Sequence, residues 1–154
     1  MKILPAFLMS LTCIQLHACT INNENEPGNN FNNGTNTDTM KLKITIGTNV
    51  FTATLYNNAT VTAFKAKLPM SIQMNELNGN EKYVDLSGDL PVNASNPGTI
   101  QTGDMMLYGA NTLVLFYKTF STSYSYTRLG FIDNHSGLAA ALGAGNVTVT
   151  FALE

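Results

Sequence analysis

Three residues near the C-terminus, Asp133, His135 and Ser136, have the side-chain types of a hydrolase triad. In such a triad a carboxylate orients a histidine, which takes the proton of the attacking serine. Here the three residues are nearly adjacent on one turn before an expected helix, a spacing that hardly permits the relay. We expect instead that Ser136 or Asn134 caps the helix and that His135 lies at the surface. Because no cysteine follows residue 19 and His135 is the last histidine, we predict no metal site.

A second group of residues has the composition of a recognition surface. Aromatic side chains, one lysine and one arginine stand among serines and threonines in residues 117–128. Tyr and Arg combine apolar area with directed hydrogen bonds, a mixture that binding surfaces use. The alternative is a solvated hairpin whose tyrosines cover the end of a barrel. The predicted ligand-binding residues are Gln101, Tyr108, Phe116, Tyr124, Tyr126 and Arg128.

The N-terminal residues predict export and lipidation. Lys2 precedes a largely apolar run that is too short to span a bilayer, so we predict that residues 1–18 are a signal peptide. Leu16, Ala18 and Cys19 resemble the bacterial lipobox, in which the cysteine receives diacylglycerol. The resemblance implies a lipid anchor at Cys19 and a place in the cell envelope. Thr20, rather than Asp, follows the cysteine, which by resemblance to known sorting signals implies the outer membrane if the organism has one.

The segment after Cys19 has the composition of a spacer. Residues 20–39 contain eight asparagines and only two large apolar residues. Such a segment buries too little surface to offset the entropy lost on ordering. We therefore predict a lipidated cysteine and a disordered tether over 19–39, followed by one domain over 40–154.

Composition limits the partners of this domain. The chain has a net charge of −2 with only 12% charged residues, and the basic residues are scattered. A scattered set of cations does not provide the positive patch that nucleic acid requires. We therefore exclude nucleic acid, and we predict no cofactor.

Hydrophobic alternation predicts a mainly β domain. The expected strands are 41–46, 50–56, 70–75, 81–86, 105–109, 112–117, 128–133 and 147–153. Short helices are expected near 60–68, before Pro69, and at 138–142. A long loop over 87–98 is a place to look for function. So many short strands favour a closed barrel with two capping helices, because closure removes exposed edges.

Four segments, 78–83, 97–104, 113–117 and 124–130, resemble a family of small bacterial cyclophilin-like proteins. The resemblance covers nearly all of 41–154 and implies a closed cyclophilin-like barrel. True cyclophilins twist a prolyl bond with an arginine, a phenylalanine and a glutamine in a segment that ends Gln-Gly-Gly-Asp. Residues 101–104 are similar to that ending, but Asn93 and Gly98 stand at the arginine and phenylalanine positions.

Three functions are consistent with this pattern. The first is a non-catalytic module that holds a small molecule or peptide at the barrel mouth. The second is a divergent prolyl isomerase, which would need Arg128 or Gln101 beside an apolar proline pocket. The third is a structural envelope component with a protein partner, which an exposed apolar patch without a pocket would favour.

Overall fold

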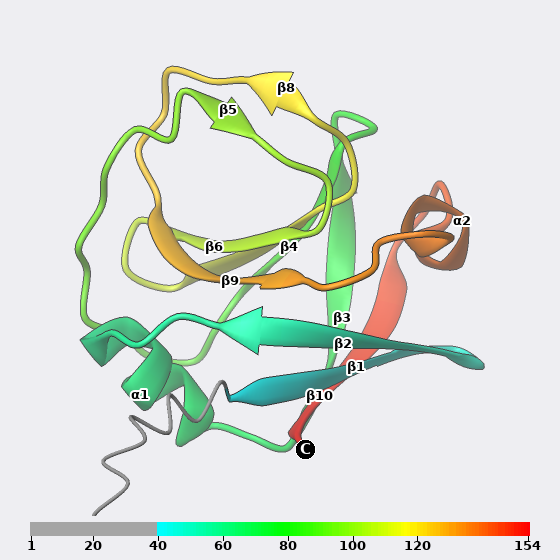
Figure 1. Ribbon diagram of the computed structural model, residues 1–154, viewed down its shortest axis with the longest axis horizontal. Coiled ribbons are helices and arrows are strands. Elements are labelled where there is room, and N and C mark those ends of the chain that lie inside the picture. The colour runs from blue at the N-terminus through cyan, green and yellow to red at the C-terminus, as the bar shows by residue number, and fades with distance from the viewer. Residues whose placement is uncertain (1–39) are drawn as a thin grey trace, which may run out of the picture. The chain divides into compact units, whose positions relative to one another are not determined.

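The computed structural model describes residues 40–154; the expected signal peptide, Cys19 and the tether lie outside the described residues. Eight strands form a closed barrel (Figure 1). They are β1 (Lys41–Ile46), β2 (Asn49–Leu55), β3 (Met70–Leu77), β4 (Glu81–Asp85), β6 (Asp104–Tyr108), β7 (Thr112–Phe116), β9 (Thr127–Ile132) and β10 (Val147–Leu153). Their order around the barrel is β1, β10, β3, β4, β7, β6, β9 and β2, and all neighbours are antiparallel. The predicted closed barrel is confirmed.

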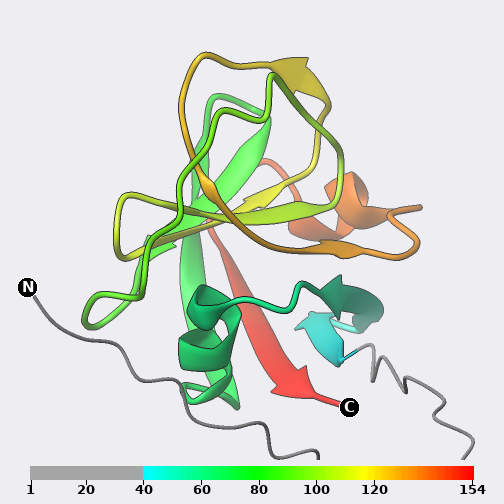
Figure 2. The ribbon, with the colours of Figure 1, turned by 60° about the vertical axis from the view of Figure 1, so that its left-hand side comes forward.

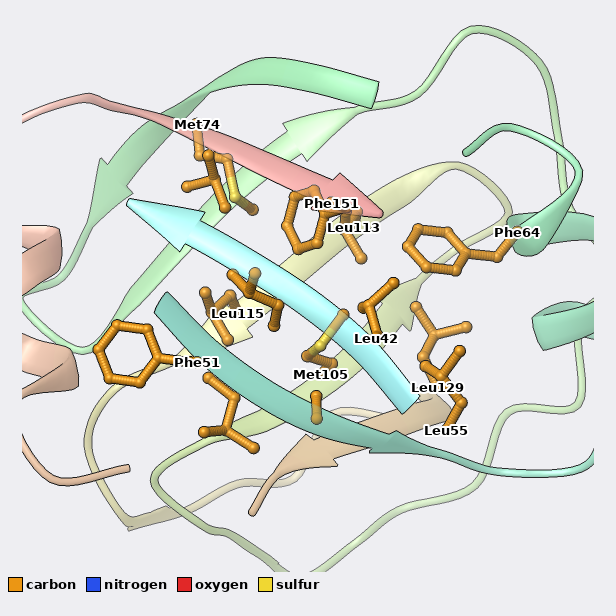
Figure 3. Packing of buried hydrophobic residues seen from close by; sticks show 14 of the residues in the cluster. Leu42, Phe51, Leu55, Phe64, Met74, Met105, Leu113, Leu115, Leu129 and Phe151 are labelled. Atoms are coloured by element: carbon orange, nitrogen blue, oxygen red, sulfur yellow. The ribbon is translucent and has the colours of Figure 1, made fainter. Parts of the chain in front are cut away.

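The barrel interior is filled by one face of each strand, because successive side chains point to opposite sides. In β1, Leu42, Ile44 and Ile46 are buried, and the residues between them are partly or fully exposed. Leu115 and Phe151 are fully buried in the same cluster, and Figure 3 shows them among the side chains that fill the interior. This apolar interior holds the strands in register.

Helix α1 (Ala59–Lys65) covers one end of the barrel (Figure 1), where Val61 and Phe64 join the core cluster. It begins at Asn58, whose Oδ1 accepts a hydrogen bond from the backbone N–H of Val61 at 2.8 Å. Its buried Phe64 meets Phe151 edge-on, with ring centroids 6.3 Å apart. The helix expected before Pro69 is therefore present and contributes to the core.

Helix α2 (Leu138–Leu142) lies at a different end of the barrel (Figures 1 and 2) and buries Leu138 and Leu142. The expectation that Ser136 or Asn134 caps it is wrong. The cap is Gly137, which enters the helix in the left-handed conformation (φ 80°) and makes no side-chain cap hydrogen bond. Asn134 Oδ1 instead accepts a hydrogen bond from the Ser136 N–H at 3.0 Å, which closes the turn before the helix.

A smaller layer lies against the outer wall of the barrel. β5 (Thr99–Ile100) and β8 (Phe120–Ser121) form a separate two-stranded sheet, seen beyond the barrel strands in Figures 1 and 2. This layer and the barrel wall share a second buried cluster. Its members are Ile100, Met106, Val114, Phe116 and Tyr126. Strands β6 and β7 are thus covered on both faces, which explains their continuous apolar sequences.

The described residues 40–154 lack two kinds of feature, a membrane-spanning helix and a cluster of metal ligands. No helix there is long and apolar enough to cross a membrane. Nor do three His, Cys, Asp or Glu side chains in that range gather where they could hold a metal ion.

Candidate ligand-binding site

A pocket of about 570 Å³ lies on the outer wall of the barrel, between strands β4 and β7 and the segment 120–126 that carries β8. Its floor comes from the outward faces of the strands. Tyr83 of β4 is paired with Val114 of β7, and Asp85 is paired with Thr112. Alternation places Glu81 on the same outward face of β4, and it also lines the pocket.

Aromatic rings form a continuous chain along the pocket. Tyr124 meets Tyr108 with centroids 6.0 Å apart, and Tyr108 meets Tyr126 at 5.6 Å. Tyr126 then contacts Phe116 at 5.6 Å, and Phe116 contacts Phe120 at 5.8 Å. Tyr124 is 61% exposed and Tyr108 is 45% exposed, whereas Tyr126 is only 7% exposed. This row of contacting rings therefore extends from exposed rings to buried rings, and the buried rings fix the positions of the exposed ones.

The charge of the pocket is negative. Glu81 and Asp85 are the charged residues among those that line it, and the lining includes no Lys, Arg or His. Asp85 Oδ1 accepts a hydrogen bond from the Thr112 hydroxyl at 2.7 Å. Burial, and next the charge of Glu76, raise the pKa of the partly buried Glu81. Burial likewise raises the pKa of Tyr126, and the Glu81 carboxylate adds to that shift.

A comparison with known families assigns this fold. The model of the Cyclophilin-like family matches residues 44–152. The chain belongs to the cyclophilin-like family. The barrel is also similar to the solution structure of a hypothetical protein from Archaeoglobus fulgidus, with a TM-score of 0.55 and 21% identity over 79% of this chain and 99% of that chain. At this identity the likeness shows the fold alone. The comparison with curated proteins found no match.

The cyclophilin-like domain brings four of the six predicted ligand-binding residues together. Tyr108, Tyr124 and Tyr126 line the pocket, and Phe116 is buried directly beneath Tyr126. The expected position of this group at the barrel mouth is wrong. Side chains at alternate positions of β6 and β7 point away from the barrel interior, so Tyr108 and Phe116 lie on the outer wall.

The other two predicted residues, Gln101 and Arg128, lie outside the pocket lining. Gln101 is exposed, and its Oε1 accepts a long hydrogen bond from Thr119 at 3.5 Å. Arg128 is exposed on β9, where its carbonyl oxygen accepts a hydrogen bond from Asn58 Nδ2 at 2.9 Å. The isomerase hypothesis required one of these two side chains beside the pocket, and neither contributes to its lining.

The carboxylates of the pocket were not among the predicted site residues. Glu81, Tyr83 and Asp85 occupy alternate positions of one expected strand, so the pattern already placed them on one face. The pattern could not show which segment covers that face, because residues 120–126 pack against it only in the folded domain. Sequence reasoning therefore identified the aromatic wall and missed the acidic floor.

The residues of the rejected triad have separate partners. Asp133 pairs with Lys41 Nζ at 2.8 Å, and its other oxygen accepts a hydrogen bond from the Thr54 hydroxyl. Burial alone would raise the pKa of Asp133, but these hydrogen bonds outweigh it and lower the pKa. With Asp133 held by β1 and β2, and the Ser136 N–H bound by Asn134, this turn is structural.

Proposed function

We propose that this cyclophilin-like domain is a non-catalytic binding module that holds a small molecule or a peptide side chain in the outer-wall pocket. The observation that carries the proposal is an open pocket of about 570 Å³ beside two partly exposed tyrosines. Its volume lies within the range of small-ligand sites, roughly 300–1,000 Å³. Exposed aromatic rings held by buried ones offer contact area at little entropic cost.

The kinds of side chain in the pocket support binding rather than covalent catalysis. Nucleophilic catalysis pairs a Ser, Cys, Thr or Lys with an adjacent base. The lining does contain hydroxyl groups, but the Thr112 hydroxyl is donated to Asp85, and no histidine, cysteine or lysine lines the pocket. The tyrosines of the lining offer hydroxyl groups for hydrogen bonding instead.

The proposal includes a lipid anchor. Cys19 lies outside the described residues, and the support for its lipidation is the resemblance of Leu16, Ala18 and Cys19 to a lipobox. A diacylglyceryl group would hold the binding module at a membrane surface. Expression in a bacterial host with an alkyne-labelled fatty acid tests this. Label on the chain that is lost in Cys19→Ser supports the anchor, and label that persists in Cys19→Ser contradicts it.

A thermal-shift screen tests the binding function. The full chain is screened against peptides, nucleotides, flavins, sugars and organic amines. A ligand at 100 times its Kd stabilises the folded state by about 2.7 kcal/mol, which raises the melting temperature by several degrees. We expect such a hit to be lost in Tyr124→Ala and kept in Tyr56→Ala, because Tyr56 is an exposed tyrosine that does not line the pocket.

Two results would count against a small-ligand module. One is that no ligand class shifts the melting temperature, which would favour a protein partner in the envelope. The other is a hit that survives both Tyr124→Ala and Tyr108→Ala, since it would bind elsewhere on the domain.

A further inference from the structure

The pocket combines two carboxylates with no opposing cation in its lining. Glu81 and Asp85 lie two residues apart on the outward face of β4. Glu81 is partly buried and Asp85 is exposed. A charge on a partly desolvated group such as Glu81 attracts an opposite charge more strongly than it would in bulk water. Asp85 keeps a second oxygen free of the Thr112 hydrogen bond, which uses Oδ1.

Nearby lysines do not neutralise this charge. Lys82 follows Glu81 along β4, but it points into the barrel, where it is fully buried and paired with Glu76. Lys118 lines a different hollow, together with Glu76 and Tyr117. Lys82 therefore lies on the opposite side of β4 from the carboxylates of Glu81 and Asp85, and Lys118 lies at a separate site.

The aromatic wall is arranged as a corner. The rings of Tyr108 and Tyr124 are inclined at 87° to each other, and those of Tyr108 and Tyr126 at 52°. All three rings line the pocket, so it is bordered by rings of different orientation. Cations bind over aromatic faces because the ring quadrupole is negative there, and several rings around one cation form the usual aromatic cage.

From this geometry we infer that the pocket selects an organic cation, with an ammonium, amidinium or guanidinium group near Glu81 and Asp85 and an apolar body against Tyr108 and Tyr124. This deepens the proposed binding function and rests on it. A single metal ion is a poorer fit, because the described residues include no group of three carboxylate, histidine or cysteine ligands. The volume also exceeds what one ion occupies.

The first test compares two probes of the same shape and different charge. Benzamidine is a cation at pH 7, and benzamide is its neutral counterpart. Each is titrated into the isotopically labelled full chain while the backbone amides of β4, β7 and residues 120–126 are followed by NMR. We expect benzamidine to shift these amides and to bind roughly tenfold more tightly than benzamide.

Neutral variants assign the preference to particular carboxylates. Glu81→Gln and Asp85→Asn should each weaken benzamidine binding by roughly fivefold and leave benzamide binding unchanged. Asp89→Asn is the matched control, because Asp89 is exposed on the following loop and does not line the pocket. It removes the same charge and should leave both affinities unchanged.

Peptide probes distinguish the source of the cation. Capped Gly-Arg-Gly and Gly-Gln-Gly are titrated in the same way. Preference for the arginine peptide supports recognition of a protein side chain, and preference confined to benzamidine supports a free organic cation. Equal binding of charged and neutral members in both pairs would overturn the inference while leaving the binding function intact. Absence of any pocket shift would also overturn it, and the broader thermal-shift screen would then decide the binding function separately.

Discussion

At the scale of single residues, Lys82 is the least expected feature of this molecule. It is fully buried, and its ammonium group donates to Glu76 and to the carbonyl oxygens of Gly143 and Gly145, at 2.9 and 2.6 Å for the two carbonyls. The Tyr117 hydroxyl donates to the same Glu76 carboxylate at 2.7 Å. This network links β3 and β4 to the loop between α2 and β10, so it closes one end of the barrel with polar contacts.

Removal of the buried ammonium group should therefore destabilise the fold. In Lys82→Met the apolar stem is kept, but two carbonyl oxygens lose the Lys82 donor, and Glu76 loses its ion pair while it keeps the hydrogen bonds from Tyr117 and Gly79. We expect a loss of about 3 kcal/mol in the free energy of unfolding, near the low end for a broken buried ion pair because Glu76 keeps some contact with water. Urea denaturation measures it.

Lys43→Met is the matched control, because Lys43 is exposed on β1. Its free energy of unfolding should change by no more than about 0.5 kcal/mol. Equal losses in the two variants would mean that the buried network contributes nothing specific.

Glu81 and Glu76 should affect the pH dependence of stability in opposite directions. The pKa of Glu81 is raised above the ordinary 4.5, first by burial and then by the charge of Glu76. Its favourable contribution is thus complete below pH 4.5 and is lost as the pH rises through the raised value. Glu81→Gln should accordingly gain stability relative to the wild type between pH 4 and pH 7, as measured by urea denaturation at each pH.

Glu76→Gln provides the opposite case. Burial alone would raise the pKa of Glu76, but hydrogen bonds from Lys82, Tyr117 and the Gly79 N–H lower it below 4.5. Its contribution is present above pH 4.5 and disappears as the pH falls through the lowered value. The stability deficit of Glu76→Gln should be large at pH 7 and shrink in acid. The same sign of pH dependence in both variants would refute this assignment.

At the scale of elements, the contact between β2 and β9 depends on one glycine. Gly130 is paired with Leu55, and a Cβ atom at Gly130 would lie 2.4 Å from the carbonyl oxygen of Thr54. No real Cβ tolerates that approach to backbone, so β2 and β9 would have to separate. The barrel therefore requires glycine here for close approach rather than for a turn.

Gly130→Ala should lower the free energy of unfolding by about 3 kcal/mol, the upper range for an overpacked site. Thermal or urea denaturation measures the loss. Gly145→Ala is the control, because a Cβ there meets nothing within 4 Å and its backbone is not left-handed. A Gly130→Ala variant as stable as Gly145→Ala would show that the two strands can move apart freely.

The sequence predicted most of the elements because the barrel strands alternate. Leu42, Ile44 and Ile46 identify the inward face of β1 without any knowledge of its neighbours. The same reasoning fails for β6 and β7, which are apolar on both faces because the outer layer covers them. Alternation thus could not tell that Tyr108 points to the outer wall. The burial of Lys82 was not predicted, because its partners, Glu76 and the carbonyl oxygens of Gly143 and Gly145, are brought together only by the fold.

At the scale of the whole molecule, the domain consists of two layers of unequal size. The barrel has a closed hydrogen-bond ladder and a large apolar interior. The outer layer has two strands of two residues each, one isolated bridge between Ser95 and Tyr126, and the smaller aromatic cluster. The pocket lies between them, so a ligand would contact the barrel wall on one side and the smaller layer on the other.

The outer layer should open more readily than the barrel, because so short a sheet contributes few protected hydrogen bonds. We expect amides of residues 95–102 and 119–126 to exchange by local opening, while those of β1, β7 and β10 exchange only with global unfolding. Hydrogen–deuterium exchange under native conditions measures this. Uniform protection across both layers would show instead that they unfold as one unit.

The position of β10 in the barrel determines when the barrel can close during synthesis. β10 pairs with β1 on one side and β3 on the other, so the ring cannot close until residues 147–153 are available. While those residues are still inside a ribosome, β1 and β3 have unpaired edges, and the nascent chain cannot complete its barrel. The barrel can therefore close only after residues 147–153 have left the ribosome. A domain whose barrel stays open until β10 is available can still be threaded across a membrane, as the proposed export requires.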